Sequence, residues 1–594
     1  MKAVSALLAG SMLLLSGCSE EGLAQVGQIF NEKLDERIAE RIASQEYETQ
    51  VEEHTYQIEK KKTPLYFGTP EDVSECELAF MDKAEDIPYI SVEGFRDIFV
   101  MMLRDMGHPQ ADLTIEKDGD VVTMTRESGF PVTIDFADDS LEFVDYDAFL
   151  RENEAQPLMD VITTTGFNDA GEPEYFSLND TSYERYGDMV TFWPGAYGID
   201  LISQDGEYYL PLQLISDIIF SHYSCNTLYN GECVCLIGAG MIEELKDQYY
   251  IADAPKERSD AVIDFNYNEL CFALDALYGL KEEHRITDFD LLFRETGLIV
   301  PMMSKDPQVA GQALSDLMSI YFDDKHSGMT GRSYMMPEDN TRNPGPTSLQ
   351  SIEEKQRYGQ AREKFYPDGF VPYEEVGNTA FITFDEFVYA DIDYYGGEKP
   401  EDYMAEDTVG LMLYAYDQIT REGSPVENVV MDLSNNVGGM ADAAAFVLGT
   451  FLGDGYISMM NPLSGALVSE NFKVDLNLDR KFDEKDSLKD YNLFCLISDN
   501  SFSCGNLVPS VFKNSRRVTL IGQQSGGGAC VVHHMTSADG CIFQISGMKH
   551  LAYMKNGSFY DIDQGAEPDF FITNPELLFD REYMTDYVNE LMGY

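Results

Sequence analysis

The second half of the chain repeats one pattern, in which a short apolar strand runs into a turn rich in glycine or serine. The apolar runs are residues 429–433, 494–497 and 518–521. Helical patterns follow the first two runs, over residues 441–451 and 507–512. Largely apolar strands are typical of a sheet that helices cover on both faces. The pattern therefore predicts an α/β layered domain.

The length of the chain requires further domains. Its 594 residues exceed what one hydrophobic core normally organises. Asp118-Gly119 and Asp205-Gly206 each lie between alternating residues and predict hairpins in a strand-rich N-terminal region. We therefore predict a multidomain α/β chain with a signal peptide (1–17), a helical stalk (18–64), a mixed α/β N-terminal domain (65–253), a helical subdomain (254–335), a linker (336–375) and an α/β domain (376–594).

The first eighteen residues carry a targeting pattern. Lys2 supplies a basic start, residues 3–15 are apolar, and Leu15-Ser16-Gly17-Cys18 closes the run. The run is too short to span a bilayer of about 30 Å, so it predicts a signal peptide. Its end resembles a bacterial lipobox, which implies a lipidated Cys18 and a place on the extracellular face of the membrane; a chance cysteine is the alternative. Residues 23–42 place apolar side chains along one side of a predicted helix. This helix fits either a stalk or a helix packed on the body.

The charge of the chain limits its partners. The formal net charge is −64, from 105 acidic and 41 basic residues. Such a surface repels phosphate backbones, so we expect no nucleic-acid partner, while it attracts cations such as calcium. Nine cysteines follow Cys18 without a zinc-like spacing, and we expect most of them to be small core residues.

Ser503 is the candidate nucleophile. It lies at a turn between an apolar strand and a helix, beside the first unpaired N–H groups of that helix. Those groups are suited to hold the oxyanion of a tetrahedral intermediate. A serine that merely caps the helix is the alternative.

A glycine-rich turn strengthens this interpretation. Asp432-Leu433-Ser434-Asn435-Asn436-Val437-Gly438-Gly439 ends a buried strand. Paired glycines let a backbone approach a substrate closely and present its N–H groups. A phosphate loop is excluded because the Gly-Lys-Ser/Thr core is absent. Gly526-Gly527-Gly528 is expected to shape the same cleft.

Five segments, in order, resemble the C-terminal-processing and tricorn-like serine peptidases over residues 254–569. They are Asp323-Asp324-Lys325-His326-Ser327, the turn 432–439, Asn500-Ser501-Phe502-Ser503-Cys504-Gly505-Asn506, the stretch 518–527 and Gly565-Ala566-Glu567-Pro568-Asp569. The resemblance implies a crotonase-like layered peptidase domain. It also implies a Ser/His triad: nucleophile Ser503, base His326, an orienting acid at Asp561 or Asp563, and oxyanion donors at Gly438, Gly439 and Cys504.

The sequence also departs from that family. The base lysine of the processing branch falls on Gly528, and the glutamate of the nucleophile segment is Asn506. The departures leave other bases open: His533, His534, Lys513 and Lys549.

An acidic loop has the spacing of an EF-hand-like calcium site. Its candidate ligands are Asp475, Asn477, Asp479, Lys481 (through its backbone position), Asp483 and Asp486. Arg480 stands where glycine is usual, and a solvated acidic loop is the alternative.

Two functions follow as hypotheses. The first is a lipid-anchored extracellular serine endopeptidase that hydrolyses proteins or peptides through an acyl-enzyme on Ser503, without a cofactor for catalysis and with a structural calcium. The alternative is an inactive peptidase-fold surface lipoprotein that binds peptides or envelope material, with or without calcium.

Overall fold

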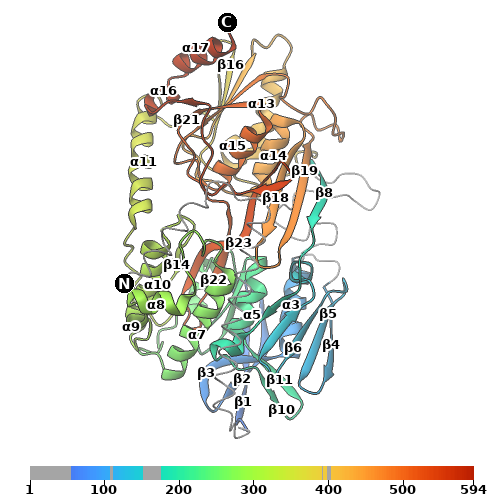
Figure 1. Cartoon of the computed structure of the whole chain (residues 1–594), viewed down its shortest axis with the longest axis vertical. Coiled ribbons are helices and arrows are strands. Elements are labelled where there is room, and N and C mark those ends of the chain that lie inside the picture. The colour runs from blue at the N-terminus through green and yellow to red at the C-terminus, as the bar shows by residue number, and fades with distance from the viewer. Residues whose placement is uncertain (1–54, 107–110, 151–175, 391, 398–402, 594) are drawn as a thin grey trace, which may run out of the picture.

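The computed structural model describes residues 55–106, 111–150, 176–390, 392–397 and 403–593 (Figure 1). It is a mixed α/β, multidomain molecule with four sheets, and the predicted fold class is confirmed. The signal peptide, Cys18 and most of the predicted stalk lie outside the described residues. Within the described ranges, no helix has both the length and the apolar character needed to cross a bilayer.

Two antiparallel-rich sheets build the N-terminal part (blue to teal in Figure 1). The seven-stranded sheet contains β10 (Ile202–Gln204), β11 (Glu207–Pro211), β3 (Ala84–Ser91), β2 (Val73–Met81), β1 (Ile58–Phe67), β13 (Val234–Gly238) and β12 (Cys225–Tyr229), in that order. The five-stranded sheet contains β4 (Leu113–Asp118), β5 (Val121–Arg126), β6 (Pro131–Asp135), β7 (Ser140–Phe143) and β9 (Val190–Phe192). Both predicted hairpins are confirmed, as β4–β5 and β10–β11.

Helices fill the space beside these sheets. They are α3 (Val92–Asp105), α4 (Tyr146–Leu150), η1 (Pro194–Tyr197), α5 (Leu212–Ile218), η2 (Phe220–Tyr223), η3 (Glu243–Leu245) and α6 (Lys246–Tyr249). The predicted stalk boundary is wrong, because strand β1 begins at Ile58. Its Lys60-Lys61-Lys62 stretch is polar, but it pairs along its length with β2, and that partner cannot be seen in the local pattern.

The helical subdomain follows. It contains α7 (Asp260–Leu277), α8 (Phe289–Thr296), α9 (Ile299–Met302), α10 (Pro307–Asp316) and the π-helical turn η4 (Leu317–Phe322). Asp306 caps α10, with proline at its first turn, as predicted. The predicted linker is wrong in part, since α11 (Pro346–Glu363) lies within it. Its turn-forming residues only start the helix, and strong helix formers follow them.

The C-terminal part is built on a six-stranded sheet. Its order is β15 (Tyr373–Val376), β16 (Thr379–Thr383), β17 (Asn428–Asp432), β20 (Asn492–Ile497), β21 (Val518–Gly522) and β25 (Phe570–Phe571), with all neighbours from β16 to β25 parallel. One face packs on α13 (Thr408–Thr420), α14 (Ala441–Leu452) and α15 (Cys504–Ser515). The other packs on α11, α16 (Pro575–Phe579) and α17 (Arg581–Met592). The short α12 (Tyr403–Glu406) precedes α13.

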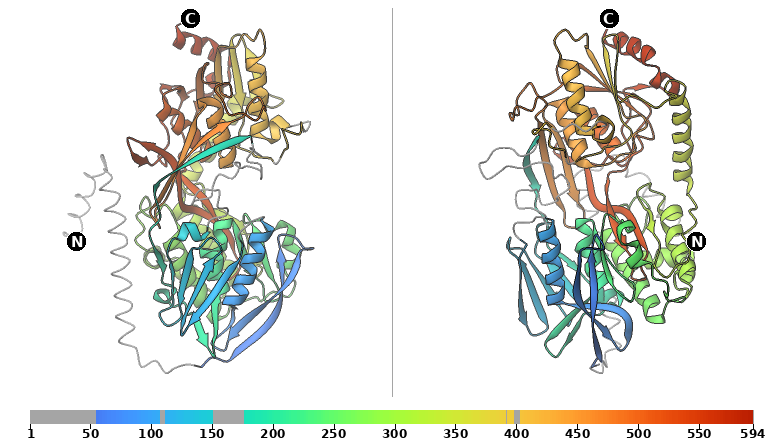
Figure 2. Two further views of the ribbon diagram at one scale, coloured as in Figure 1. Left: turned by 90° about the vertical axis from the view of Figure 1, so that its right-hand side faces the viewer. Right: turned by 180° about the vertical axis from the view of Figure 1, so that it is seen from behind.

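A second seven-stranded sheet ties the parts together. It contains β14 (Gly328–Gly331), β23 (Ile542–Lys555), β18 (Gly455–Asn461), β19 (Ala466–Val474) and β8 (Ser177–Arg185), with β22 (Cys530–Thr536) and β24 (Ser558–Tyr560) also on β23. The hairpin predicted at Asn556-Gly557 is β23–β24. Phe543 and Ile545 of β23 join the N-terminal core, while Leu551 and Tyr553 join the C-terminal core. Figure 2 shows the resulting red strand passing from one part to the other.

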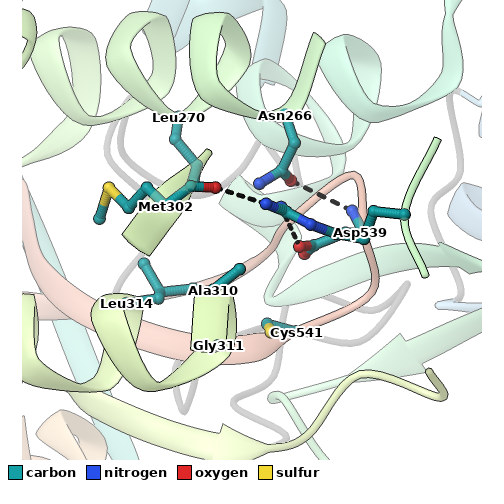
Figure 3. A pocket seen from close by; sticks show the side chains of 9 residues that line it. Asn266, Leu270, Met302, Ala310, Gly311, Leu314, Asp539 and Cys541 are labelled. Carbon is teal, nitrogen blue, oxygen red and sulfur yellow. Dashed lines mark hydrogen bonds and ion pairs between the residues drawn. The ribbon is translucent and has the colours of Figure 1, made fainter. Parts of the chain in front are cut away.

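A buried ion pair fastens the β22–β23 turn to the helical subdomain. Arg258 Nη1 lies 2.8 Å from Asp539 Oδ2, and Asn266 Oδ1 accepts the backbone N–H of Asp539 (Figure 3). The cavity beside them has a volume of about 10 Å³, which is barely enough for one water molecule. It is therefore part of the scaffold and too small for a peptide.

The nine cysteines after Cys18 are buried, and none of them forms a disulfide within the described residues. They behave as small core residues, as predicted from their spacing.

Candidate active site

Ser503 occupies a strained turn between β20 and α15. Its backbone has φ 55° and ψ −124°, a conformation that an L residue rarely adopts. The Ser503 N–H donates to Gly527 O at 2.9 Å, and Ser503 O accepts from the N–H groups of Asn506 and Leu507. These bonds hold a partly exposed hydroxyl at the start of a helix, where N–H groups are unpaired.

The glycine-rich turn after β17 supplies a second N–H group. Asn436 Oδ1 accepts the N–H of Gly438 at 2.9 Å, so that predicted oxyanion donor is already engaged. The N–H groups of Gly439 and Cys504 make no hydrogen bond with any residue that the structure describes. Two of the three predicted donors, each next in the chain to Gly438 or Ser503, are thus unpaired within the described residues.

Gly438 instead permits close approach. A Cβ atom there would lie 2.6 Å from Ser503 Cβ and 3.1 Å from Ser503 Oγ, and the φ of Gly438 is 110°. Glycine is required because only its bare Cα lets the turn touch the nucleophile.

The second glycine run is equally confined. A Cβ atom would lie 2.2 Å from Asp499 O at Gly526, 1.9 Å from Asp563 O at Gly527 and 2.6 Å from the Phe502 ring at Gly528. Phe502 therefore fills the space that a side chain at position 528 would need. This packing explains why a lysine cannot stand there without rearranging the nucleophile segment.

His326 reaches the nucleophile segment from the helical subdomain. Its ring centre lies 4.6 Å from that of Phe502, the residue before Ser503. Burial lowers the pKa of His326 to about 4, although the nearby Asp324 carboxylate opposes the shift. Within the described chain, neither ring nitrogen has a hydrogen-bond partner, so the bond to Ser503 Oγ is not formed in this arrangement.

The two predicted orienting acids have other partners. Asp563 Oδ1 accepts the N–H of Ala529 at 3.0 Å, and burial raises the pKa of Asp563. Asp561 Oδ2 lies 3.7 Å from His550 Nδ1. Although burial opposes the change, His550 lowers the pKa of Asp561. Asp563 lies next to the glycine run, but neither acid bonds to His326.

The alternative bases lie in other surroundings. The ring of His533 packs on His222 at 4.9 Å, and burial lowers the pKa of His533 to about 3. Burial also lowers the pKa of His534, the next residue of β22. Lys513 pairs with Asp569, and the positive charge of Lys549 helps to depress the pKa of His533. None of the four makes a hydrogen bond or ion pair with Ser503 in the described structure.

Three residues lie within the quoted motif segments but received no role from the sequence. They are Lys325, Asn436 and Phe502. Lys325 and His326 contact the Phe502 ring, and Asn436 O accepts the N–H of Phe502, and these contacts depend on tertiary approach.

The acidic loop is held by its own side chains. Asp475 accepts the N–H groups of Asp479 and Arg480, and Asp486 accepts those of Leu476 and Asp483. In the described ranges, no group of three or more acidic, histidine or cysteine side chains is placed to hold a metal ion. Calcium binding by this loop therefore stays a prediction of the sequence.

A protein-family model matches the C-terminal part of the chain. Residues 402–572 match the model of peptidase family S41. That match contains Ser503 and both glycine turns, but not His326. A curated protein of Chlamydia pneumoniae is 36% identical over 109 residues, so the alignment spans only 16% of this chain and 16% of that relative.

Several solved structures align with parts of the chain at low sequence identity. The photosystem II D1 C-terminal processing protease is 18% identical over 35% of this chain and 46% of its own, with a TM-score of 0.26. A lipoprotein from Streptococcus agalactiae is 14% identical over 52% and 96%, with a TM-score of 0.31. Mature CPAF is 13% identical over 56% and 96%, with a TM-score of 0.34.

Proposed function

Because this chain belongs to peptidase family S41, a family of serine-type peptidases, through residues 402–572, we propose that it is an endopeptidase with Ser503 as its nucleophile. The observation that carries the proposal is the strained Ser503 backbone, with the free N–H groups of Gly439 and Cys504 beside it. A strained serine that faces unpaired N–H groups is suited to acyl transfer.

The reaction would proceed by the usual triad logic. His326 is neutral at pH 7 because its pKa is depressed, so its imidazole is in the form that accepts the Ser503 proton. Ser503 Oγ then attacks the scissile carbonyl carbon, and the oxyanion is held by the N–H groups of Gly439 and Cys504. The imidazolium returns the proton to the leaving amine, and water hydrolyses the acyl-enzyme by the same path. These steps need no metal or cofactor.

One geometric adjustment belongs to this proposal. A ring nitrogen of His326 must approach Ser503 Oγ, and both of its nitrogens are free of bonds to the described residues. The Asp324 carboxylate is the charge that stabilises the imidazolium of His326 in this arrangement. Of the two predicted acids, Asp563 is the better placed because its backbone touches Gly527.

Location and substrate follow from the remaining sequence features. The lipobox-like end at Cys18 supports a lipid-anchored protein on the extracellular face of the membrane. The family supports a protein or peptide substrate, and the net charge of −64 disfavours polyanions.

The test is digestion of a complex peptide mixture by the full-length protein, read by mass spectrometry. We expect cleavage by the wild type and none by Ser503→Ala or His326→Ala, while Ser558→Ala in β24 serves as the serine control and should cleave like the wild type. Cleavage lost in Ser503→Ala alone would move the base away from His326. Binding of peptides without cleavage would favour the inactive peptide-binding lipoprotein.

A further inference from the structure

The turn that carries His326 is folded by its own residues. Asp323 and Lys325 have left-handed backbones, with φ of 46° and 67°. Asp324 Oδ1 accepts the N–H of His326 at 3.1 Å and that of Ser327 at 2.7 Å. These bonds shape the turn, but they do not fix its position relative to Ser503.

The side chain of Lys325 makes the contact across to the nucleophile segment. Its Nζ lies 3.5 Å from Asp499 Oδ2 and 5.2 Å from the ring centre of Phe502. A Cβ atom at Gly526 would lie only 3.1 Å from that Nζ, so the bare glycine makes room for the ammonium. The Lys325 side chain is 13% exposed, and an ammonium so well buried needs a nearby negative charge.

We propose that Lys325 is a positioning residue, whose ammonium holds the His326 turn against the nucleophile segment through Asp499 and Phe502. His326 itself touches that segment through the Phe502 ring, with no hydrogen bond from either nitrogen to the described residues. Lys325 and His326 thus both pack against the Phe502 ring. The ion pair between Lys325 and Asp499 adds an electrostatic contact to this packing. The inference rests on the proposed function, in which His326 is the base.

The test compares Lys325→Met, Lys325→Arg and Asp499→Asn in the full-length protein. Since a misplaced base costs about 10–100-fold in rate, we expect Lys325→Met and Asp499→Asn to lower kcat by that factor, with KM changed less than about 3-fold. Lys325→Arg keeps the positive charge and the contact with the ring, so its kcat should stay within about 3-fold of the wild type. Lys364→Met removes an exposed ion pair with Glu576 and serves as the control.

A second readout does not need turnover. Diethyl pyrocarbonate modifies free imidazoles, and mass spectrometry locates the product at His326. We expect faster modification of His326 in Lys325→Met and Asp499→Asn, and an unchanged rate in Lys325→Arg and Lys364→Met. If the wild type neither cleaves peptides nor reacts at Ser503 with a fluorophosphonate, the proposed function fails, and this readout still decides the role of Lys325.

Three results would overturn the inference. The first is a kcat for Lys325→Met within about 3-fold of the wild type. The second is a Lys325→Arg variant as slow as Lys325→Met, which would indicate direct proton transfer by the amine, because arginine does not deprotonate. The third is an unchanged modification rate at His326. If Lys325→Met does not fold, Asp499→Asn and Lys325→Arg give the same comparison.

Discussion

At the scale of single residues, the site depends on how closely backbone segments approach one another. Gly438 touches Ser503, so Gly438→Ala would push the nucleophile away from the free N–H groups. We expect a loss of about 100-fold in the rate of Ser503 labelling by a fluorophosphonate. Gly557→Ala is the matched control, because Gly557 also has positive φ but nothing within 4 Å of its missing Cβ. Equal labelling of the two variants would contradict this explanation.

The pH dependence of catalysis follows from His326. The base must be neutral to accept a proton, and burial lowers the pKa of His326 to about 4. The neutral form therefore predominates above about pH 4, and kcat/KM should rise with pH through about 4 and be level by about pH 6. Initial rates between about pH 3.5 and 8, with unfolding checked at each pH, measure this. A midpoint near the ordinary histidine value of about 6.5 would mean that His326 is more exposed to solvent, or that it is not the base.

At the scale of elements, a buried ion pair joins α17 to the end of β17. Arg581 Nη2 lies 2.9 Å from Asp432 Oδ2, with both side chains almost fully buried. Arg581→Met removes the ion-pair partner of that buried carboxylate, so we expect a loss of about 3–5 kcal/mol in the free energy of unfolding. Urea unfolding measures it, with Lys62→Met at an exposed pair as a control that should show no shift. A small effect would show that water reaches Asp432.

A carboxyl pair makes the packing of α5 on α7 sensitive to pH. Burial raises the pKa of Asp217 to about 6, and burial together with Asp217 raises the pKa of Glu269 well above its ordinary value. The folded state therefore holds more protons than the unfolded state above about pH 4, so stability falls as pH rises from about 4 through 6 and stays low above it. Glu269→Gln should raise Tm at about pH 7.5 and have little effect at about pH 4.5.

Thermal unfolding at the two pH values tests this second element-scale prediction. Glu422→Gln, at an exposed position, is the control. Equal effects of Glu269→Gln at both pH values would show that the pair does not titrate between them.

The elements that the sequence predicts well are those with a complete local signal. The strands β17, β20 and β21 are largely apolar and buried, and Asp306 caps α10. By contrast, β1 is lysine-rich and is a strand only through its pairing with β2. In the same way, Ser503 and Gly439 stand at motif positions, whereas the engagement of the Gly438 N–H depends on a side-chain contact that no periodicity encodes.

At the scale of the whole molecule, the peptidase region is not separable from the rest of the chain. Strand β8, which lies within the predicted N-terminal domain, pairs with β19 along most of its length. Strand β14 of the helical subdomain pairs with β23, and the first half of β23 packs in the N-terminal core. The catalytic base of the proposal also comes from outside the region that matches the family.

A fragment of residues 376–594 should therefore fail as an independent enzyme. It would expose the apolar residues that β22 and β23 bury in the N-terminal core, Met535, Phe543 and Ile545 among them, and it would lack His326. Exposed apolar surface of this kind favours aggregation. We expect the fragment to be insoluble or to unfold without cooperativity, and to show no peptide cleavage, whereas the full-length chain unfolds cooperatively. Circular dichroism melting and the peptide digestion measure both. A soluble, cooperative fragment with active Ser503 would show that the shared sheet is dispensable and that the base lies within residues 376–594.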